Sequence, residues 1–333
     1  YIETSRPLVV LTAPGPGSGK LATCLSQLYH ENKRGVQAGY AKFETFPIWN
    51  LPLNHPVNVA YEAATADLKD VNKVDNFHLE AYGEITVNYN RDIEVFPVVS
   101  SILAKITGKE CIYKSPTDMG VNMAGYCIVD DEVCREASKK EILRRYYKAL
   151  CDLKRGDCKK DTVERLEFLM SRLGITQATR PVVEKAREKS GQNDDCGAVA
   201  LELQDGRIVT GKNTQRMSAS AACVFNAVKM LAGIKDSQKL ISPYVIGPII
   251  DMKTKILKEH DKTLTLEEAL LALSICAASD ATAATAMEQL TQLDGCDAHS
   301  THILHKADEN PFRKLGVRLS SDPEFLGDTL FNE

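Results

Sequence analysis

PLVVLTAPGPGSGK, residues 7–20, joins an apolar run to a glycine-rich turn and decides how this chain is interpreted. The apolar run over 7–13 predicts a buried strand, because it is short and rich in β-branched residues. Residues 21–32 then predict a helix, since apolar residues recur there at helical spacing. A strand, a glycine-rich turn and a helix in this order predict an α/β fold of the P-loop-like or Rossmann type.

The glycine-rich turn is expected to bind phosphate. Glycine lets the backbone curl around an anion, and the N–H groups at the start of the following helix point toward that anion. Lys20, at the start of the helix, would reach the terminal phosphates of a nucleotide. The residues expected to hold the phosphate groups are Gly15, Gly17, Ser18, Gly19, Lys20 and Thr23.

The turn departs from the usual P-loop pattern, G-x-x-x-x-G-K-[ST]. Pro14 occupies the first glycine position, and Leu21 replaces the hydroxyl residue that would hold Mg²⁺. Thr23 supplies a hydroxyl two residues later, which would serve only in a different geometry. A plain structural connection between a strand and a helix therefore remains the alternative to phosphate binding.

Phosphoryl transfer would need Mg²⁺ with ATP or GTP, and side chains that position and neutralise the phosphate groups. Carboxylates are the candidate ligands of the metal ion, and basic side chains would neutralise the phosphate charge. Taken singly, each of these residues is more readily explained by a surface or helix-capping role. The candidate catalytic residues are Lys20, Glu44, Arg91, Asp92 and Asp118, with Asp67 and Lys114 as further candidates.

The chain divides into three predicted segments. Residues 1–130 are expected to form the P-loop-like α/β domain with three layers, and residues 131–176 a helical connector. Residues 177–333 are expected to form a second α/β domain, which opens with a hairpin around the turn at 204–206. Further predicted elements are strands over 39–43 and around 84–96, and helices over 57–69, 131–173, 218–233, 248–260 and 265–292.

The layout of residues 197–247 is similar to that of cytidine deaminases, with a hairpin, an alanine-rich helix and a proline-containing turn. Those enzymes begin the helix with His-Ala-Glu or Cys-Ala-Glu, and Pro-Cys-x-x-Cys supplies the other zinc ligands. The matching stretches here read SAA over 220–222 and PYVIG over 243–247. Every zinc ligand and the catalytic glutamate are therefore missing, so a shared fold would not bring zinc chemistry, and no zinc is expected.

Three histidines near the end of the chain suggest a different function. His299, His302 and His305 follow one another at three-residue spacing, so neighbouring members could share a metal ion on a helix. A metal-dependent hydrolase centred on His299 and His302 is therefore an alternative. The spacing lacks the H-E-x-x-H order of zinc proteases. Surface or capping histidines, or a polar loop that lines a pocket, remain the simpler interpretations, and no metal site is predicted.

Composition excludes several classes of protein. The 333 residues carry a formal charge of −4, with a pI near 6.0, so no electrostatic basis for binding nucleic acid or an anionic membrane is present. No apolar run approaches the roughly 20 residues that span a bilayer, and no signal peptide is recognisable. The ten cysteines form no C-x-x-C pair. Reduced thiols in a cytoplasmic protein are therefore expected.

Several long stretches are specific enough to indicate a family. They are RPLVV (6–10), TAPGPGSGK (12–20), ATCLSQLYHE (22–31), GYAKFETFPIWNLP (39–52), VNYNRD (87–92), KSPTDMGVN (114–122), DGRIVTGK (205–212) and AHST (298–301). They resemble a bacterial family known as domain of unknown function 1846, over essentially the whole chain. The resemblance implies an additional N-terminal α/β region, so the chain is expected to be part of a longer protein. It implies no particular activity.

Two functions from different classes remain beside the metal hydrolase. The first is an enzyme that uses a small phosphorylated ligand, most plausibly a nucleoside triphosphate with Mg²⁺, held by the amides of residues 15–20 and by Lys20. The second is a non-catalytic binding or assembly module, in which the glycine turn is structural and subunits meet through an apolar interface. A homo-oligomer is expected as the partner, and neither nucleic acid nor a membrane.

Overall fold

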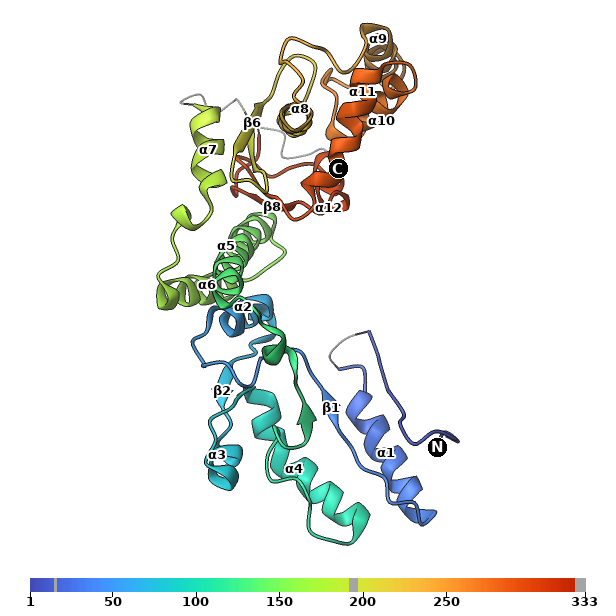
Figure 1. Cartoon of the computed structure of the whole chain (residues 1–333), viewed down its shortest axis with the longest axis vertical. Helices are drawn as coiled ribbons and strands as arrows, with labels where there is room; N and C mark the ends of the chain where they lie inside the picture. Colours follow the sequence, from blue (N-terminus) through green and yellow to red (C-terminus); the bar gives the residue numbers. More distant parts are fainter. Residues whose placement is uncertain (15–16, 192–196, 327–333) are drawn as a thin grey trace. The chain divides into compact units, whose positions relative to one another are not determined.

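The computed structural model describes residues 1–14, 17–191 and 197–326. Helices and short strands alternate along the chain, so the predicted mixed α/β class is confirmed (Figure 1). Contacts within the chain divide it into two compact units, residues 1–138 and residues 139–333. The boundary falls within α5 (Asp131–Arg155), and each unit has its own buried side chains.

Two short strand pairs form the β structure that is described in the first unit. β1 (Lys42–Phe43) pairs in parallel with β4 (Gly120–Val121), and β2 (Asn72–Val74) pairs antiparallel with β3 (Val87–Tyr89). The strand expected over 7–13 is not formed, because none of the described residues pairs with this stretch. The three-layer arrangement expected of a P-loop-like domain stays a prediction.

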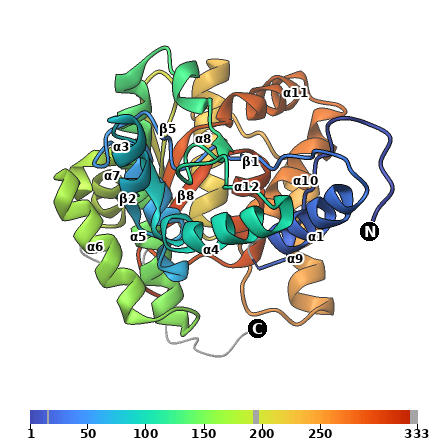
Figure 2. The same cartoon turned by 90° about the horizontal axis from the view of Figure 1, so that it is seen from below.

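Helices supply most of the regular secondary structure described in the first unit. α1 packs against α4 through Leu28, Phe96 and Leu103, and the two helices lie side by side in both views (Figures 1 and 2). The strand signal around 84–96 was right only for β3, since α4 begins directly after it. The helices are α1 (Lys20–Lys33), α2 (Pro56–Ala64), α3 (Asn76–Tyr82) and α4 (Asn90–Thr107), with 3₁₀ turns at Ala66–Leu68 and Ala124–Cys127.

A four-stranded mixed sheet forms the centre of the second unit, in the order β6-β5-β7-β8. β5 (Ala198–Glu202) pairs antiparallel with β6 (Ile208–Lys212), which confirms the predicted hairpin. β5 also pairs antiparallel with β7 (Asp297–Ser300), and β7 pairs in parallel with β8 (Arg318–Ser321). Gly206, in the hairpin turn, has a positive φ of 82°, which glycine adopts without a steric cost.

Helices cover both faces of this sheet. Alternation along β5 directs Ala200 toward α7 (Pro181–Ser190), whereas Val199 and Leu201 join the core that includes α8 (Ala219–Ala232). A Cβ on Gly211 of β6 would lie 2.2 Å from the backbone nitrogen of Cys223, so only glycine permits α8 to pack this closely. The other helices include α6 (Lys160–Leu173), α10 (Leu266–Ala277), α11 (Ala281–Glu288) and α12 (Lys306–Lys314).

One helix begins earlier than expected, and the predicted break between two others is confirmed. α5 (Asp131–Arg155) and α6 confirm the predicted helical region and its break at 154–157. α9 (Pro243–Asp251) begins five residues before the expected start, because the Ser242 side chain caps it and a proline fits its first position. A π-helical turn, Met252–Ile256, then continues it.

Candidate functional site

The glycine-rich turn leads directly into α1. Gly17 and Gly19 have positive φ angles of 74° and 84°, and Gly19 caps α1 without a side-chain hydrogen bond. The Lys20 Nζ lies 3.2 Å from the Ser18 Oγ. This places a backbone turn that glycine favours, an ammonium group and a helix N-terminus together, which is the combination that suits an anion. Gly15 lies outside the described residues.

Thr23 faces its own helix. Its hydroxyl donates to the Gly19 carbonyl oxygen at 3.1 Å. A threonine that bonds to the backbone four residues earlier is an ordinary feature of a first helical turn. To reach an ion at the turn, Thr23 would have to give up this bond.

A cluster of charged and hydroxyl groups lies beside β1, and we call it the Lys42 cluster. Its members are Lys42, Glu44, Tyr89 and Asp92. The Lys42 ammonium forms ion pairs with both carboxylates, at 2.5 Å to Glu44, and donates to the Tyr89 hydroxyl. Tyr89 donates in turn to Glu44 at 2.7 Å. Two carboxylates thus share a single ammonium group.

Burial controls the protonation of this cluster. The Glu44 side chain is buried, so desolvation raises its pKa, and the nearby Lys42 charge only partly offsets this effect. The negative charge of Asp92 raises the pKa of Glu44 further. Burial and then Glu44 raise the pKa of Tyr89 well above its usual range. Glu44 is therefore a carboxylate whose proton affinity is increased by its surroundings, a property found in many catalytic acids and bases.

Tyr40 connects α1 with the Lys42 cluster. Burial raises its pKa to about 12, and the charges of Cys24, Asp92 and Glu44 add to that effect. Cys24 lies in the second turn of α1. Tyr40 packs against the apolar cluster that contains Leu28 of α1, and its hydroxyl lies in the field of the Asp92 and Glu44 carboxylates.

The structure brings together some of the predicted residues and not others. Glu44 and Asp92 meet at Lys42, whereas Arg91 binds the buried Asp70 at 2.7 Å. Asp118 accepts the backbone N–H of Lys114 at 2.9 Å, as a turn-capping residue does. Asp67 is exposed in the 3₁₀ turn after α2.

Sequence reasoning missed Lys42 and Tyr89. Lys42 and Glu44 are two residues apart on an extended segment, so their side chains lie on the same side of it. That spacing was visible in the sequence, and it would have paired the two residues. Tyr89 precedes a predicted site residue by only three positions, but nothing in its local pattern indicates that its hydroxyl reaches Glu44.

The three histidines of the second unit do not converge. His299 is buried in β7, where its Nδ1 lies 2.9 Å from the Ser320 Oγ and its Nε2 lies 3.3 Å from Asp322. Burial lowers the pKa of His299, and also lowers that of His302 to about 4. Over 1–14, 17–191 and 197–326, no group of three potential metal ligands lies together.

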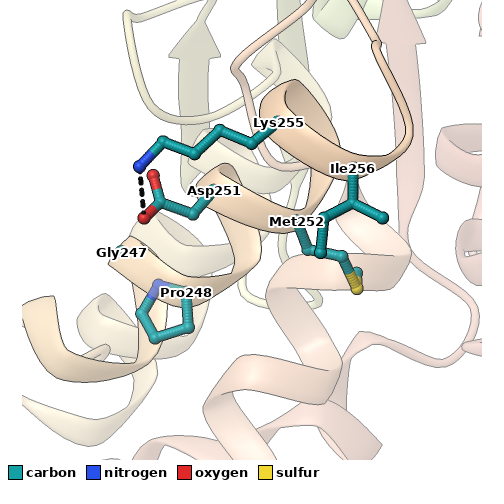
Figure 3. Close-up of a pocket in the computed structure, with 6 residues that line it drawn as sticks. All are labelled: Gly247, Pro248, Asp251, Met252, Lys255 and Ile256. Atoms are coloured by element: carbon teal, nitrogen blue, oxygen red, sulfur yellow. Dashed lines mark ion pairs between the residues drawn. The ribbon is translucent and has the colours of Figure 1, made fainter.

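A shallow hollow of about 500 Å³ lies along α9 and the π-helical turn (Figure 3). The only ion pair drawn there joins Asp251 to Lys255, at 2.9 Å. Met252 and Ile256 supply apolar surface. Because the two charged side chains of this hollow pair with each other, it suits contact with another apolar surface better than catalysis.

The fold and the site define a mixed α/β protein with two units, one of which carries a glycine-rich turn and a half-buried charged cluster. Two family models together match nearly the whole chain. "Domain of unknown function DUF1846, N-terminal" matches residues 1–174, and the corresponding C-terminal model matches residues 178–331. The chain therefore belongs to the family of domain of unknown function 1846, as the sequence resemblance indicated.

Clostridial relatives share more than half of their matched residues with this chain. A UPF0371 protein of Clostridioides difficile is 55% identical over 338 residues, which cover 99% of this chain and 68% of the relative. UPF0371 proteins of Clostridium botulinum (strain Alaska E43) and Clostridium tetani are 56% and 55% identical, and the match covers 67% of each. No helix among the described residues is long and apolar enough to cross a membrane.

Proposed function

We propose that the protein binds a phosphorylated ligand at the start of α1, and that this ligand is a nucleoside triphosphate with Mg²⁺. The P-loop-like character of the first unit is part of the same proposal. The observation that supports it is the Lys42 cluster, in which two carboxylates surround one ammonium group in the same unit as the glycine-rich turn. A helix N-terminus alone attracts an anion weakly. The two carboxylates of the cluster would add oxygen ligands for a metal ion, and the ammonium group would add a positive charge.

Each residue would have a definite task. The amides after Gly17 and the Lys20 ammonium would hold the terminal phosphates. Asp92, which is partly exposed, would bind Mg²⁺ through a carboxylate oxygen. Glu44, with its raised pKa, would accept the proton of an attacking hydroxyl or water. Hydrolysis or phosphoryl transfer in the cytoplasm would be the resulting reaction.

Thermal stability with and without ligand tests this proposal. ATP, GTP, ADP and inorganic phosphate, each with and without Mg²⁺, would be compared for the natural protein, Lys20→Ala and Lys33→Ala. A ligand at about 100 times its Kd adds about 2.7 kcal/mol, which raises Tm by a few degrees. We expect the shift to be lost in Lys20→Ala and kept in Lys33→Ala, since Lys33 lies at the other end of α1.

Two results would count against phosphate binding at this turn. One is the absence of a shift with every ligand. The other is an equal shift in all three proteins, because the ligand would then bind elsewhere. Either result would leave the turn as a structural connection.

A second candidate function is self-assembly through α9 and α10. Tyr244 and Ile256 are 91% and 73% exposed, and Leu271 of α10 is 62% exposed. α9 packs against α10, so these side chains belong to one region of the second unit. The adjoining Asp251 and Lys255 carry opposite charges, which two copies related by a twofold axis could pair across an interface. A second copy of the chain is therefore the partner that this surface suits.

A further inference from the structure

A separate pocket of about 460 Å³ lies within the first unit, and we call it the Trp49 pocket. This volume falls in the range of small-molecule sites, about 300–1,000 Å³. It shares no lining residue with the Lys42 cluster. Loops supply most of its wall, and its lining residues include Trp49, Asn50, His78, Glu84, Thr86, Thr117, Asn122 and Tyr126.

Two glycines allow the wall to form. A Cβ on Gly120 would lie 2.6 Å from the ring carbon Cη2 of Trp49, and a Cβ on Gly125 would lie 1.9 Å from the Asn50 Oδ1. Neither glycine has a positive φ, so backbone conformation is not what requires glycine there. The close approach of Trp49 and Asn50 explains why positions 120 and 125 are glycine. It also determines where the Trp49 indole and the Asn50 amide line the pocket.

Hydrogen bonds determine which of the Thr86 and Thr117 hydroxyls donates and which accepts. The buried Asp75 accepts from the Thr117 backbone N–H at 3.1 Å and from the Thr117 hydroxyl at 2.6 Å. Because that hydroxyl proton is committed to Asp75, the Thr86 hydroxyl is the donor in its 3.1 Å contact with Thr117. Thr86 has then committed its only proton, so it offers the pocket an acceptor.

The tautomer of His78 follows from a similar argument. Ser115 is fully buried, and its Oγ accepts from the Asp118 N–H at 2.9 Å. Among the described contacts of the buried Ser115 hydroxyl, the His78 Nδ1, also at 2.9 Å, is the one atom that can accept its proton, so Ser115 donates to it. The Nε2 of His78 then carries the hydrogen and is a donor, 3.9 Å from the exposed Glu84 carboxylate.

Two further polar atoms of the lining residues have no partner among the residues that the structure describes. They are the Trp49 Nε1, a donor, and the Asn122 Oδ1, an acceptor. Asn122 is only 6% exposed, and its Nδ2 donates to the Pro47 carbonyl at 2.7 Å. Leaving a buried polar atom unpaired costs about 1–3 kcal/mol. Both atoms are closed to solvent, so a ligand would reach them through a small movement of the pocket wall and would then recover part of this energy.

We propose that the Trp49 pocket binds a planar nitrogen heterocycle of the nucleobase type. Such a ring carries N–H donors for Asn122, Thr86 and Glu84, and ring-nitrogen or carbonyl acceptors for Trp49 and His78. The indole of Trp49 and the phenol ring of Tyr126 supply aromatic surface for it. This site is independent of the phosphate site proposed at α1.

Trp49 provides the readout, because it is the only tryptophan of the chain. Adenosine, guanosine, cytidine and uridine would be titrated while tryptophan fluorescence is followed, with glucose and inorganic phosphate as controls. We expect a saturable change with at least one nucleoside and none with glucose or phosphate. Absence of a saturable change up to millimolar nucleoside would overturn the proposal, and so would a response to glucose alone.

Variants locate the response. Asn122→Leu and Thr86→Val remove acceptors with little change of volume, and each should weaken nucleoside binding about tenfold or more. Thr107→Val is the matched control, since the Thr107 hydroxyl donates to backbone of its own helix end. If Asn122→Leu fails to fold, the nucleoside affinity of Thr86→Val alone tests the proposal.

Lys20→Ala should leave the nucleoside response unchanged. Unchanged affinity in the folded pocket variants, or loss in Lys20→Ala, would contradict a separate site.

Discussion

Lys42 holds two carboxylates and a tyrosine hydroxyl that would otherwise have no common cation. Glu44 is buried, so its ionised form depends on this ammonium group. Asp92 is partly exposed, so the two carboxylates differ in environment. In the proposed function, this difference would let Glu44 accept a proton while Asp92 binds the metal ion.

Replacing Lys42 by methionine should destabilise the first unit by about 1–3 kcal/mol, because a buried carboxylate loses its charged hydrogen-bond partner. Chemical denaturation would measure the loss. Lys105→Met is the control, since Lys105 is exposed near the end of α4. The double variant with Glu44→Gln should recover part of the loss. Equal stability of Lys42→Met and Lys105→Met would show that the Lys42 cluster contributes no net stability.

The sequence allowed part of the candidate site to be predicted. Glu44 and Asp92 were recognised as carboxylates near predicted strands, but their common partner was not. Their meeting depends on how β1 and α4 pack, which spacing along the chain does not reveal. Asp118 shows the opposite case, because an acidic residue in a polar loop here accepts a backbone N–H nearby.

Among the elements, local patterns were most reliable where they described hairpins and amphipathic helices. The turn between β5 and β6 and the break between α5 and α6 are set by glycine and by neighbouring residues. The run over 7–13 has strand composition, yet a strand also needs a neighbour with which to exchange hydrogen bonds. Residues 90–96 were misassigned because three apolar residues among four polar ones, in so short a window, do not distinguish a strand from a helix.

Gly211 in β6 provides a test at the level of packed elements. An alanine there would bring its Cβ to 2.2 Å from the Cys223 nitrogen and 2.7 Å from the Ala219 carbonyl oxygen, both in α8 backbone. We expect Gly211→Ala to lose about 1–3 kcal/mol or more of unfolding free energy. Thermal or urea unfolding would measure the loss.

Gly247 in α9 is the matched control for that substitution. It has no atom within 4 Å of the added Cβ and no positive φ. Gly247→Ala should be neutral or stabilising by up to about 1 kcal/mol, because alanine favours a helix interior. Equal changes in unfolding free energy for Gly211→Ala and Gly247→Ala would contradict the close contact between β6 and α8.

For the whole molecule, both units expose large apolar side chains. The first also carries the charged cluster and the Trp49 pocket, and in the second the exposed apolar side chains include those on α9 and α10. Composition and periodicity predicted the α/β class because they depend on which elements form and not on how these elements are arranged in space. The grouping of residues into two units depends on contacts between distant parts of the chain, which composition and periodicity do not contain.

Self-assembly can be tested by light scattering at micromolar concentration. We expect a mass of at least twice the 36.7 kDa of one chain, and a return toward one chain in Leu271→Glu. A charged side chain in an apolar interface would be desolvated without a partner. Leu68→Glu, at an exposed position of the first unit, should leave the mass unchanged. A natural protein that is monomeric would exclude this interface at that concentration.

The sheet of the second unit has a consequence for how the chain is made. β5 sits between β6, which follows it at once, and β7, whose Ser300 pairs with Val199. At roughly 5–20 residues per second, the ribosome needs about 5–20 s to deliver β7 after β5. During that interval one edge of an apolar strand is open to other nascent chains. A chaperone that binds extended apolar segments should therefore associate with this protein late in translation, before residue 300 emerges.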